Sequence, residues 1–261
     1  MKSWKIFLAI GLVVFFIGLG VLIAGLAFNG WEFNVDYEMQ TYNSTEENTV
    51  LDLNLAAGEM YVGFYDGESI EVEYPTSYRY GYEVKEKNGK LTVEPKQHFG
   101  IWFGFGWNRV PAIVVRIPRG KVMQLDIDIS AGKIEVADGE FTSVRADMSA
   151  GWTNLGNLKC GKFVSHISAG KLDLESLECT DFDLRLSAGS ASIDSVKTDK
   201  ITVDLSAGSA NLTVNGKKSD YYITVDKSAG SCNVSGQQGT VVGKVIDIDL
   251  SAGSVNVQFS D

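Results

Sequence analysis

The residues of this chain that could do chemistry are mainly carboxylates that recur at a fixed spacing. Aspartates stand two positions before several serines in the second half of the chain, and Asp126, Asp128 and Asp147 form the densest group. Carboxylates gathered in this way can bind Ca²⁺ or cleave a glycan. Asp128 and Asp147 would repel each other at strand spacing, so they could share a cation or one could titrate upward. No aromatic subsite and no basic residue of evident role accompanies them, and we expect them to point into water with nothing bound.

The other candidate groups do not form a known reaction centre. The two histidines, His98 and His166, have no cysteine or carboxylate beside them at metal-ligand spacing. Seven serines recur in the second half, but no base is placed beside them, and a repeated hydroxyl is better explained by bonding to the backbone. The sequence contains no phosphate-binding loop and no G-x-S-x-G elbow. We therefore expect no enzyme activity, no cofactor and no metal.

The three cysteines indicate packing more than reactivity. Cys160 and Cys179 are separated by one full repeat, which places them at equivalent positions of adjacent repeats. Their α-carbons would then lie within the range that a disulfide permits, although parallel stacking holds the β-carbons somewhat far apart. A bridge between them stays open at this point. Cys232 occupies an apolar position of its repeat and is expected to be a small core residue.

A tripeptide, Ser-Ala-Gly, organises these side chains and occurs seven times. The first five copies recur at every nineteenth position, and the last two intervals are three and four positions longer. A fixed period of this size indicates a repeat architecture. The glycines of the seven copies are Gly132, Gly151, Gly170, Gly189, Gly208, Gly230 and Gly253.

The apolar pattern changes phase at each of these glycines. Ile127 and Ile129 stand at odd positions before Gly132, whereas Ile134 and Val136 stand at even positions after it. Alternation with a period of two indicates half-buried strands, and a glycine that resets the phase indicates a corner. We expect the alanine before each glycine to face inward and the serine to face outward. Each unit has too few apolar residues for a core of its own, so stacking of the units must bury one. The sequence therefore predicts an all-β fold, a parallel β-solenoid of 19-residue coils.

Two features depart from the regular repeat. Lys227 occupies a position that the other copies fill with an apolar residue, and an unpaired buried ammonium is costly, so we expect a distorted coil there. The extra residues at 215–220 and 235–240 indicate enlarged loops at one corner, where solenoids often bind partners.

Residues 1–28 differ from the rest of the chain. Residues 1–5 include two lysines and are expected in the cytoplasm, and residues 6–28 form an uncharged, mostly apolar run long enough to span a membrane as a helix. A cleaved signal peptide is the competing interpretation, but the run is too long for the usual signal core. Gly11, Gly18 and Gly25 would line one face of the helix, where it could pack against another helix.

Between the anchor and the regular repeats, the sequence predicts a polar stalk at 29–47 and irregular capping coils at 48–125, with a hairpin turn at Asn88-Gly89. The regular coils occupy 126–261. The segment 98–107 interrupts the cap with five aromatic residues, Phe99, Trp102, Phe103, Phe105 and Trp107. They either fold over the cap or form an exposed patch for a partner. The apolar C-terminal strand, 255–259, is expected to leave an edge that invites self-association.

The net charge constrains the partners. The 23 basic and 33 acidic residues give −10 at pH 7. Such a balance argues against nucleic acid as a partner and favours cations or basic peptides.

Several stretches resemble a known bacterial family. They are the glycine-spaced anchor, Gly89-Lys90-Leu91-Thr92-Val93, Arg116-Ile117-Pro118 and the run of Asp-apolar-Ser-Ala-Gly repeats. Together they resemble the membrane-anchored "putative adhesin" domain-of-unknown-function family of Gram-positive envelopes, over nearly the whole chain. The resemblance implies a β-solenoid outside the membrane and supplies no catalytic residues.

From these observations we expect a non-catalytic, single-pass membrane protein that contacts a protein or another envelope component. A regulatory or sensory membrane subunit of an envelope stress response is the alternative, because some members of the family are linked with such systems. A glycan-acting β-helix enzyme is a third hypothesis.

Overall fold

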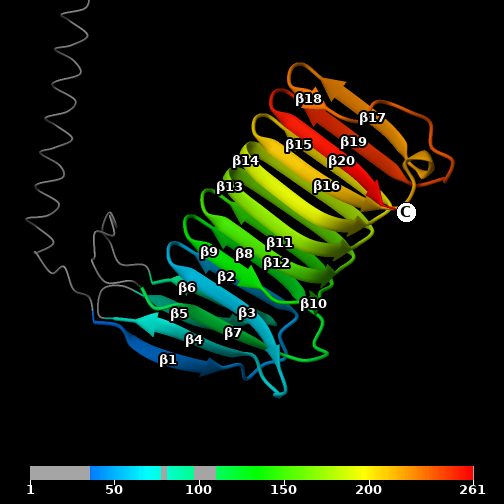
Figure 1. Cartoon of the computed structure of the whole chain (residues 1–261). Helices are drawn as coiled ribbons and strands as arrows, with labels where there is room; N and C mark the ends of the chain where they lie inside the picture. Colours follow the sequence, from blue (N-terminus) through cyan, green and yellow to red (C-terminus); the bar gives the residue numbers. More distant parts are fainter. Residues whose placement is uncertain (1–35, 78–80, 97–109, 261) are drawn as a thin grey trace, which may run out of the picture. The chain divides into compact units, whose positions relative to one another are not determined.

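The computed structural model describes residues 36–77, 81–96 and 110–260, and these residues form an all-β fold (Figure 1). Two stacks of hydrogen-bonded strands contain nearly all of it. The first stack holds, in spatial order, β5 (Tyr82–Lys87), β6 (Lys90–Pro95), β2 (Val50–Leu55), β8 (Gln124–Ile129), β11 (Ser143–Met148), the first halves of β13 (Lys162–Glu178) and β14 (Asp181–Lys197), β15 (Lys200–Leu205), β19 (Val245–Leu250) and β17 (Tyr222–Lys227).

The second stack is made by the strands that follow the corners. It holds, in spatial order, β1 (Glu38–Asn43), β4 (Glu71–Thr76), β7 (Ile113–Pro118), β3 (Glu59–Tyr65), β9 (Lys133–Val136), β12 (Trp152–Lys159), the second halves of β13 and β14, β16 (Ser209–Asn215), β20 (Ser254–Ser260) and β18 (Ser231–Cys232). A short strand, β10 (Gly139–Glu140), pairs with the end of β12, and a 3₁₀ helix, η1 (Lys218–Asp220), precedes β17.

The regular coils are parallel, and each is offset from the next by one repeat. Ala146 of β11 lies opposite Ile127 of β8 on one side and opposite Ser165 of β13 on the other. The same offset relates β12 to β9 and to β13 in the second stack. This is the pairing that a parallel β-solenoid requires, and it confirms the register predicted from the repeat.

The core lies between the inward faces of the two stacks. Strands alternate buried and outward positions, as in β8, where Leu125, Ile127 and Ile129 are buried. In successive coils Phe163 and Phe182 pack with ring centroids 5.7 Å apart. Burying a side chain of this size stabilises the fold by roughly 1.5–3 kcal/mol, so the energy of the fold resides in the contacts between coils.

The corner glycines have the role predicted from the sequence. All seven have φ between +90° and +159°, where a side chain is disfavoured. They also touch one another, because a Cβ placed on Gly151 would lie 2.3 Å from the carbonyl oxygen of Gly132. Only glycine therefore allows both the turn and the close approach of the next coil.

The alanines of the repeat do not face inward as predicted. The serines before them are exposed, and so are all seven alanines: Ala131, Ala150, Ala169, Ala188, Ala207, Ala229 and Ala252. The prediction was wrong because the alternation of the strand ends at the residue before the serine. Ile129 and Ile134 fill the inward positions on the two sides of the first corner, and the tripeptide bulges between them into solvent.

The last two coils do not stack in chain order. β19 lies between β15 and β17, and β20 lies between β16 and β18. The C-terminal strand is therefore inside the stack, with Val255 and Val257 buried. This corrects the expectation of an exposed C-terminal edge for Ser254 and Val255, which pair with β18, and the Asn233 side chain bonds the backbone of Val257; β18 does not extend along the rest of β20.

The same order explains the two other irregularities. Lys227 is exposed because it belongs to the outermost coil, 222–232. The distortion expected in this coil is absent from β17, which pairs along its whole length with β19, but the second strand of the coil, β18, is only two residues long. The extra residues after β16 and β18 give the chain the length to pass one coil and return. They connect coils in an exchanged order, which accounts for their length.

The N-terminal coils close the other end. The coil 50–65 is in register with 124–136, and the hairpin β5–β6 turns at Asn88 (φ +54°) and Gly89 (φ +74°), both as predicted. Residues 38–43, expected in a stalk, instead form β1, which pairs antiparallel with β4.

The carboxylate of Glu86 stabilises this cap by accepting hydrogen bonds. Glu86 of β5 accepts hydrogen bonds from the Tyr42 hydroxyl, from the backbone N–H and hydroxyl of Thr45, from the backbone N–H of Glu46 and from the Asn48 amide. Burial alone would raise the pKa of Glu86, but the hydrogen bonds to the ionised form outweigh it and lower the pKa from 4.5 to about 2.

Two of the predicted segments lie outside the described residues. They are the apolar run 6–28 and the aromatic segment with Phe99, Trp102, Phe103, Phe105 and Trp107. Within the described residues, no helix has the length and apolar character to cross a membrane.

Candidate interaction surface

The outward face of the first stack presents polar side chains in straight columns. One column contains the residue two places before each repeat serine. In spatial order it runs Asn54, Asp128, Asp147, His166, Arg185, Asp204, Asp249 and Asp226. The neighbouring column, two positions earlier, is polar except at Val164 and runs Asp52, Asp126, Arg145, Val164, Asp183, Thr202, Asp247 and Thr224. The fold places these side chains on one face because outward positions of parallel strands stack in register.

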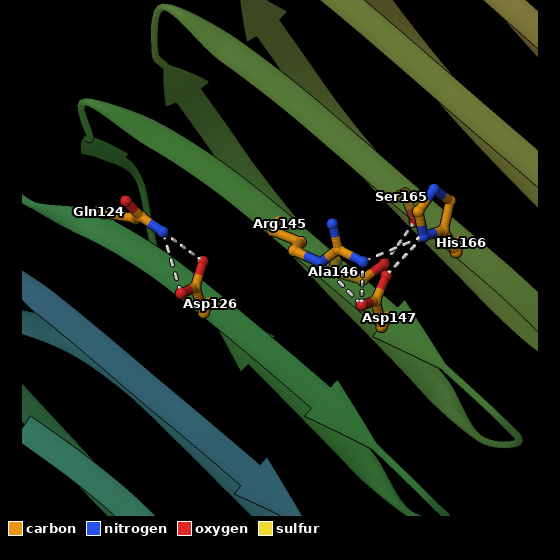
Figure 2. A network of polar contacts seen from close by, with 7 residues as sticks. All are labelled: Gln124, Asp126, Arg145, Ala146, Asp147, Ser165 and His166. Atoms are coloured by element: carbon orange, nitrogen blue, oxygen red, sulfur yellow. Dashed lines mark hydrogen bonds and ion pairs between the residues drawn. The ribbon is translucent and has the colours of Figure 1, made fainter.

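A network of Arg145, Asp147 and His166 lies on β11 and β13 at the centre of this face, and Gln124 and Asp126 form a separate contact on the neighbouring β8 (Figure 2). The Arg145 Nε donates to the Asp147 Oδ2 at 2.8 Å, and the Arg145 Nη2 lies 2.8 Å from the same oxygen. His166 Nδ1 lies 2.9 Å from Asp147 Oδ1 and 3.4 Å from the Arg145 Nη2. Asp147 therefore joins two basic side chains from adjacent coils, which sequence spacing alone did not reveal.

The aspartates predicted to repel one another have different surroundings. Asp147 forms an ion pair with Arg145 and lies beside His166, and Asp126 accepts two hydrogen bonds from the Gln124 amide at 2.9 and 3.0 Å. Partial burial raises the pKa of Asp128, and the charges of Asp147 and Asp52 raise it further. Within the described residues, no three histidine, cysteine or acidic side chains are grouped so that they could hold a metal ion.

The Asp147–His166 pair has half of the geometry of a general-base dyad. A carboxylate on Nδ1 would leave Nε2 to take a proton from a nucleophile. His166 Nε2 is buried and has no hydrogen-bond partner among the described residues. The neighbouring Ser165 is also buried, and its hydroxyl donates to the Ala146 carbonyl at 3.0 Å. Among the described residues, the Ser165 hydroxyl is thus bonded to a backbone carbonyl and does not pair with His166 Nε2.

The face beyond this network is acidic. Asp204, Asp249 and Asp226 follow one another on β15, β19 and β17, and all three are exposed. Arg185 separates them from the network and lies 3.1 Å from Asp183 on its own strand. The surface thus has a centre of mixed charge, where Arg145 pairs with Asp147 and Arg185 with Asp183, and beyond it the acidic residues Asp204, Asp249 and Asp226.

The second stack presents a different arrangement, centred on Trp152. Its indole is 37% exposed and lies between two ammonium groups from the adjacent coils, Lys133 at 4.4 Å and Lys171 at 5.5 Å from the ring centroid. The indole N–H donates to Asp173 at 2.7 Å. Both faces of the ring are near a lysine. We call Lys133, Trp152 and Lys171 the ladder, and it joins three coils through cation–π contacts.

A family model, Toastrack DUF4097, matches residues 50–261 of the chain. The chain belongs to the Toastrack DUF4097 family. The match spans all the coils described above and begins with the first residue of β2. No curated protein is similar enough to this chain to be matched.

Several solved structures are similar to this Toastrack chain, all at low identity. A "putative adhesin" from Parabacteroides distasonis is 10% identical over 85% of this chain and 98% of its own, with a TM-score of 0.49. A "putative adhesin" from Bacteroides fragilis is 11% identical over 84% and 97%, with a TM-score of 0.45. A "putative cell adhesion protein" from Clostridium sporogenes is 14% identical over 86% and 100%, with a TM-score of 0.31. Likenesses this distant do not indicate what the Toastrack chain binds.

The cysteines of the Toastrack domain are free thiols in the structure. Cys160 is buried and Cys179 is half-buried, at equivalent places of adjacent coils as predicted. Burial raises the pKa of Cys160 to about 12, with a further contribution from Cys179, and burial raises the pKa of Cys179 to about 11. Thiols with so little thiolate at neutral pH are packing residues and not nucleophiles.

Proposed function

We propose that this Toastrack chain is a non-catalytic interaction protein of the bacterial cell envelope, adhesin-like in its mode of contact. Residues 6–28 would anchor it in the membrane, with the N-terminus in the cytoplasm and the solenoid on the extracytoplasmic side. Its partner would be a protein or another envelope component that lies along the outward face of the first stack.

The observation that carries the proposal is the pair of polar columns on that face. Coils at strand spacing repeat the same two outward positions from Asp52 to Thr224, which suits a partner that makes many similar contacts along a flat surface. Basic Arg145 and Arg185 stand among acidic residues, so a partner must carry both negative and positive charges at matching positions. Such a pattern favours specificity over raw affinity.

The chemistry of the face supports contact more than turnover. The Asp147–His166 pair has no nucleophile beside it in the described part of the chain, and the two aspartates nearest to it are hydrogen-bonded or exposed. A surface of this kind can hold a ligand but supplies no general acid and base in facing positions. The uncharged run at 6–28 in the sequence supports the anchoring part of the proposal.

Labelling of single cysteines tests the topology. Val242 is fully exposed on the loop after β18, and Ser3 stands before the apolar run. In intact cells, a membrane-impermeant maleimide should label Val242→Cys at once, whereas Ser3→Cys should be labelled only after lysis. The unmodified chain is the control for the native thiols. Labelling of both variants, or of neither, in intact cells would contradict the proposed orientation.

Site-specific photo-cross-linking tests the contact surface. A photoreactive amino acid at Arg185 would stand on the first stack, and the matched control at Asn211 would stand on the second stack; both positions are exposed. We expect a discrete cross-linked species from Arg185 and none from Asn211 in living cells. Equal cross-linking from the two faces would remove the reason for assigning the contact to the first stack.

A regulatory role through the membrane helix is the second candidate, and the seven-residue spacing of Gly11, Gly18 and Gly25 favours it. Replacing the three glycines with leucine should leave an envelope contact at Arg185 intact if the solenoid is the functional part. Loss of function with an unchanged Arg185 cross-link would favour the regulatory role.

A further inference from the structure

The position of one lysine gives a physical reason for the exchanged order of the last two coils. We call residues 222–232 the end coil and residues 245–260 the inserted coil. The inserted coil pairs on both sides, with β15 and β16 on one side and with β17 and β18 on the other (Figure 1). The end coil pairs with the inserted coil alone among the regular strands of the described chain.

At one inward position a charged residue of the end coil matches an apolar residue of the inserted coil. Leu205 and Leu250 are fully buried in register with each other, and Lys227 is in register with Leu250 on its outer side. If the coils stacked in chain order, Lys227 would lie between Leu205 and Leu250. Its ammonium would then be buried between the side chains of two leucines. Burial of a charge without an ionic partner has a large desolvation cost in free energy. At the end of the stack the same ammonium is exposed to water.

The rest of the terminal edge is partly closed by side chains and by a loop. Ile223 exchanges two backbone hydrogen bonds with Gln237, each of 3.0 Å. The Asn233 amide donates to the Val257 carbonyl at 2.9 Å and accepts from the Val257 N–H at 2.8 Å, as a strand would. Beyond Ile223, no pairing of the outer edge of β17 is recorded in the described residues, and this open part contains Lys227.

An open strand edge invites pairing with another chain, and an inward-pointing charge is a known way to prevent it. We propose that Lys227 assigns the end coil to the terminus of the stack and keeps that terminus from pairing with a second copy of this chain. A second copy is the relevant occupant because its own end coil presents the same open edge of β17, so that two such edges could pair. The lysine makes this otherwise matching contact unfavourable.

Replacement of the lysine tests the barrier. The full-length chain in mild detergent is compared by sedimentation velocity as wild type, Lys227→Leu, Lys227→Arg and Asp226→Leu. Lys227→Leu should associate at least tenfold more tightly than wild type, and hydrogen exchange at Val225 and at position 227 should slow in the associated form. Lys227→Arg keeps the charge and should match wild type. Asp226→Leu adds the same side chain on the outward face and should also match wild type.

A swap of the two residues tests the order. Leu250→Lys places an ammonium inside the stack and should lower the denaturant midpoint sharply. In the double variant with Lys227→Leu, the coil that carries the lysine could move to the end, and the midpoint should recover. The proposal is overturned if Lys227→Leu sediments and exchanges as wild type does, or if Leu250→Lys costs no stability. It is likewise overturned if the double variant is no more stable than Leu250→Lys.

Discussion

Alanine substitution at a corner glycine should separate the two demands that the corner places on the residue. Gly189 has φ +141°, and a Cβ built on it would lie 2.4 Å from the carbonyl oxygen of Gly170 and 3.0 Å from its nitrogen. The neighbouring atoms belong to backbone, so they cannot rotate away. Two other glycines provide matched controls. Gly243 has φ +90° with no atom within 4 Å, and Gly63 has neither a positive φ nor a close neighbour.

The expected costs follow from these geometries. Gly63→Ala should be neutral or stabilise by about 0.5 kcal/mol, because alanine lowers the entropy of the unfolded chain. Gly243→Ala should cost about 1 kcal/mol, which is the penalty of a side chain in the left-handed region. Gly189→Ala incurs the same penalty and must also push two coils apart by about 1 Å, which overpacking data place at a further ~1–3 kcal/mol. We expect about 3 kcal/mol in total.

Guanidinium unfolding followed by far-ultraviolet circular dichroism measures these costs in the three variants. Hydrogen exchange then shows which strands lose protection, and for Gly189→Ala we expect the loss of protection in β13 and β14. Because repeat proteins can unfold in parts, a change in the denaturant slope would indicate that the stack has divided at this corner. If Gly189→Ala costs no more than Gly243→Ala, the close contact between corner glycines does not hold the coils, and the reasoning fails.

Further substitutions and reactions address other contacts. Glu86→Gln should destabilise the cap by about 1–2 kcal/mol at neutral pH. Since the pKa of Glu86 is lowered to about 2, the stability it contributes is complete above pH 4.5 and is lost as the pH falls toward 2, so acid titrations of wild type and variant should converge there. Trp152→Ala should cost about 1–2 kcal/mol through two cation–π contacts and one hydrogen bond, and a similar loss in high salt would contradict their electrostatic part. Cys160 should react with a thiol reagent at pH 8 on the order of 10³ times more slowly than an exposed thiol, and Cys179 also slowly, with both reacting freely in denaturant. Asp128→Asn should raise stability at pH 7 by less than about 0.5 kcal/mol, because its raised pKa reflects an unfavourable charge that is largely solvated; a loss of stability would show that the charge is favourable.

Much of this fold was predictable because one spacing determines the pairing. In a parallel stack with this repeat length, residue 127 must lie beside residue 146, and the structure confirms that register. The glycine corners were predictable for the same reason, since a phase change at a fixed place requires an unusual backbone angle. The alanines were misplaced because alternation in sequence does not show where a strand ends and a bulge begins.

The coil order was not predictable from spacing alone, because either order of the last two coils keeps the same register. Lys227 is the signal in the sequence, because a charged residue at an inward position is tolerated in the outermost coil, where it is exposed. The contact of Arg145 with Asp147 and His166 depends on side-chain directions that spacing does not give. The contact of Trp152 with Lys133 and Lys171 is predictable from the sequence, because the three residues stand at the same position of successive repeats.

Contacts between corner glycines test the stacking of the coils most directly. In a deuterated sample of the full-length chain with protonated glycines, nuclear Overhauser effects should link Gly253 to both Gly208 and Gly230, because a Cβ on Gly253 would lie 2.3 Å from the Gly208 oxygen, and one on Gly230 the same distance from the Gly253 oxygen. No effect should link Gly208 directly to Gly230. A direct effect between Gly208 and Gly230, with none from Gly208 to Gly253, would contradict the stacking order on which the account rests.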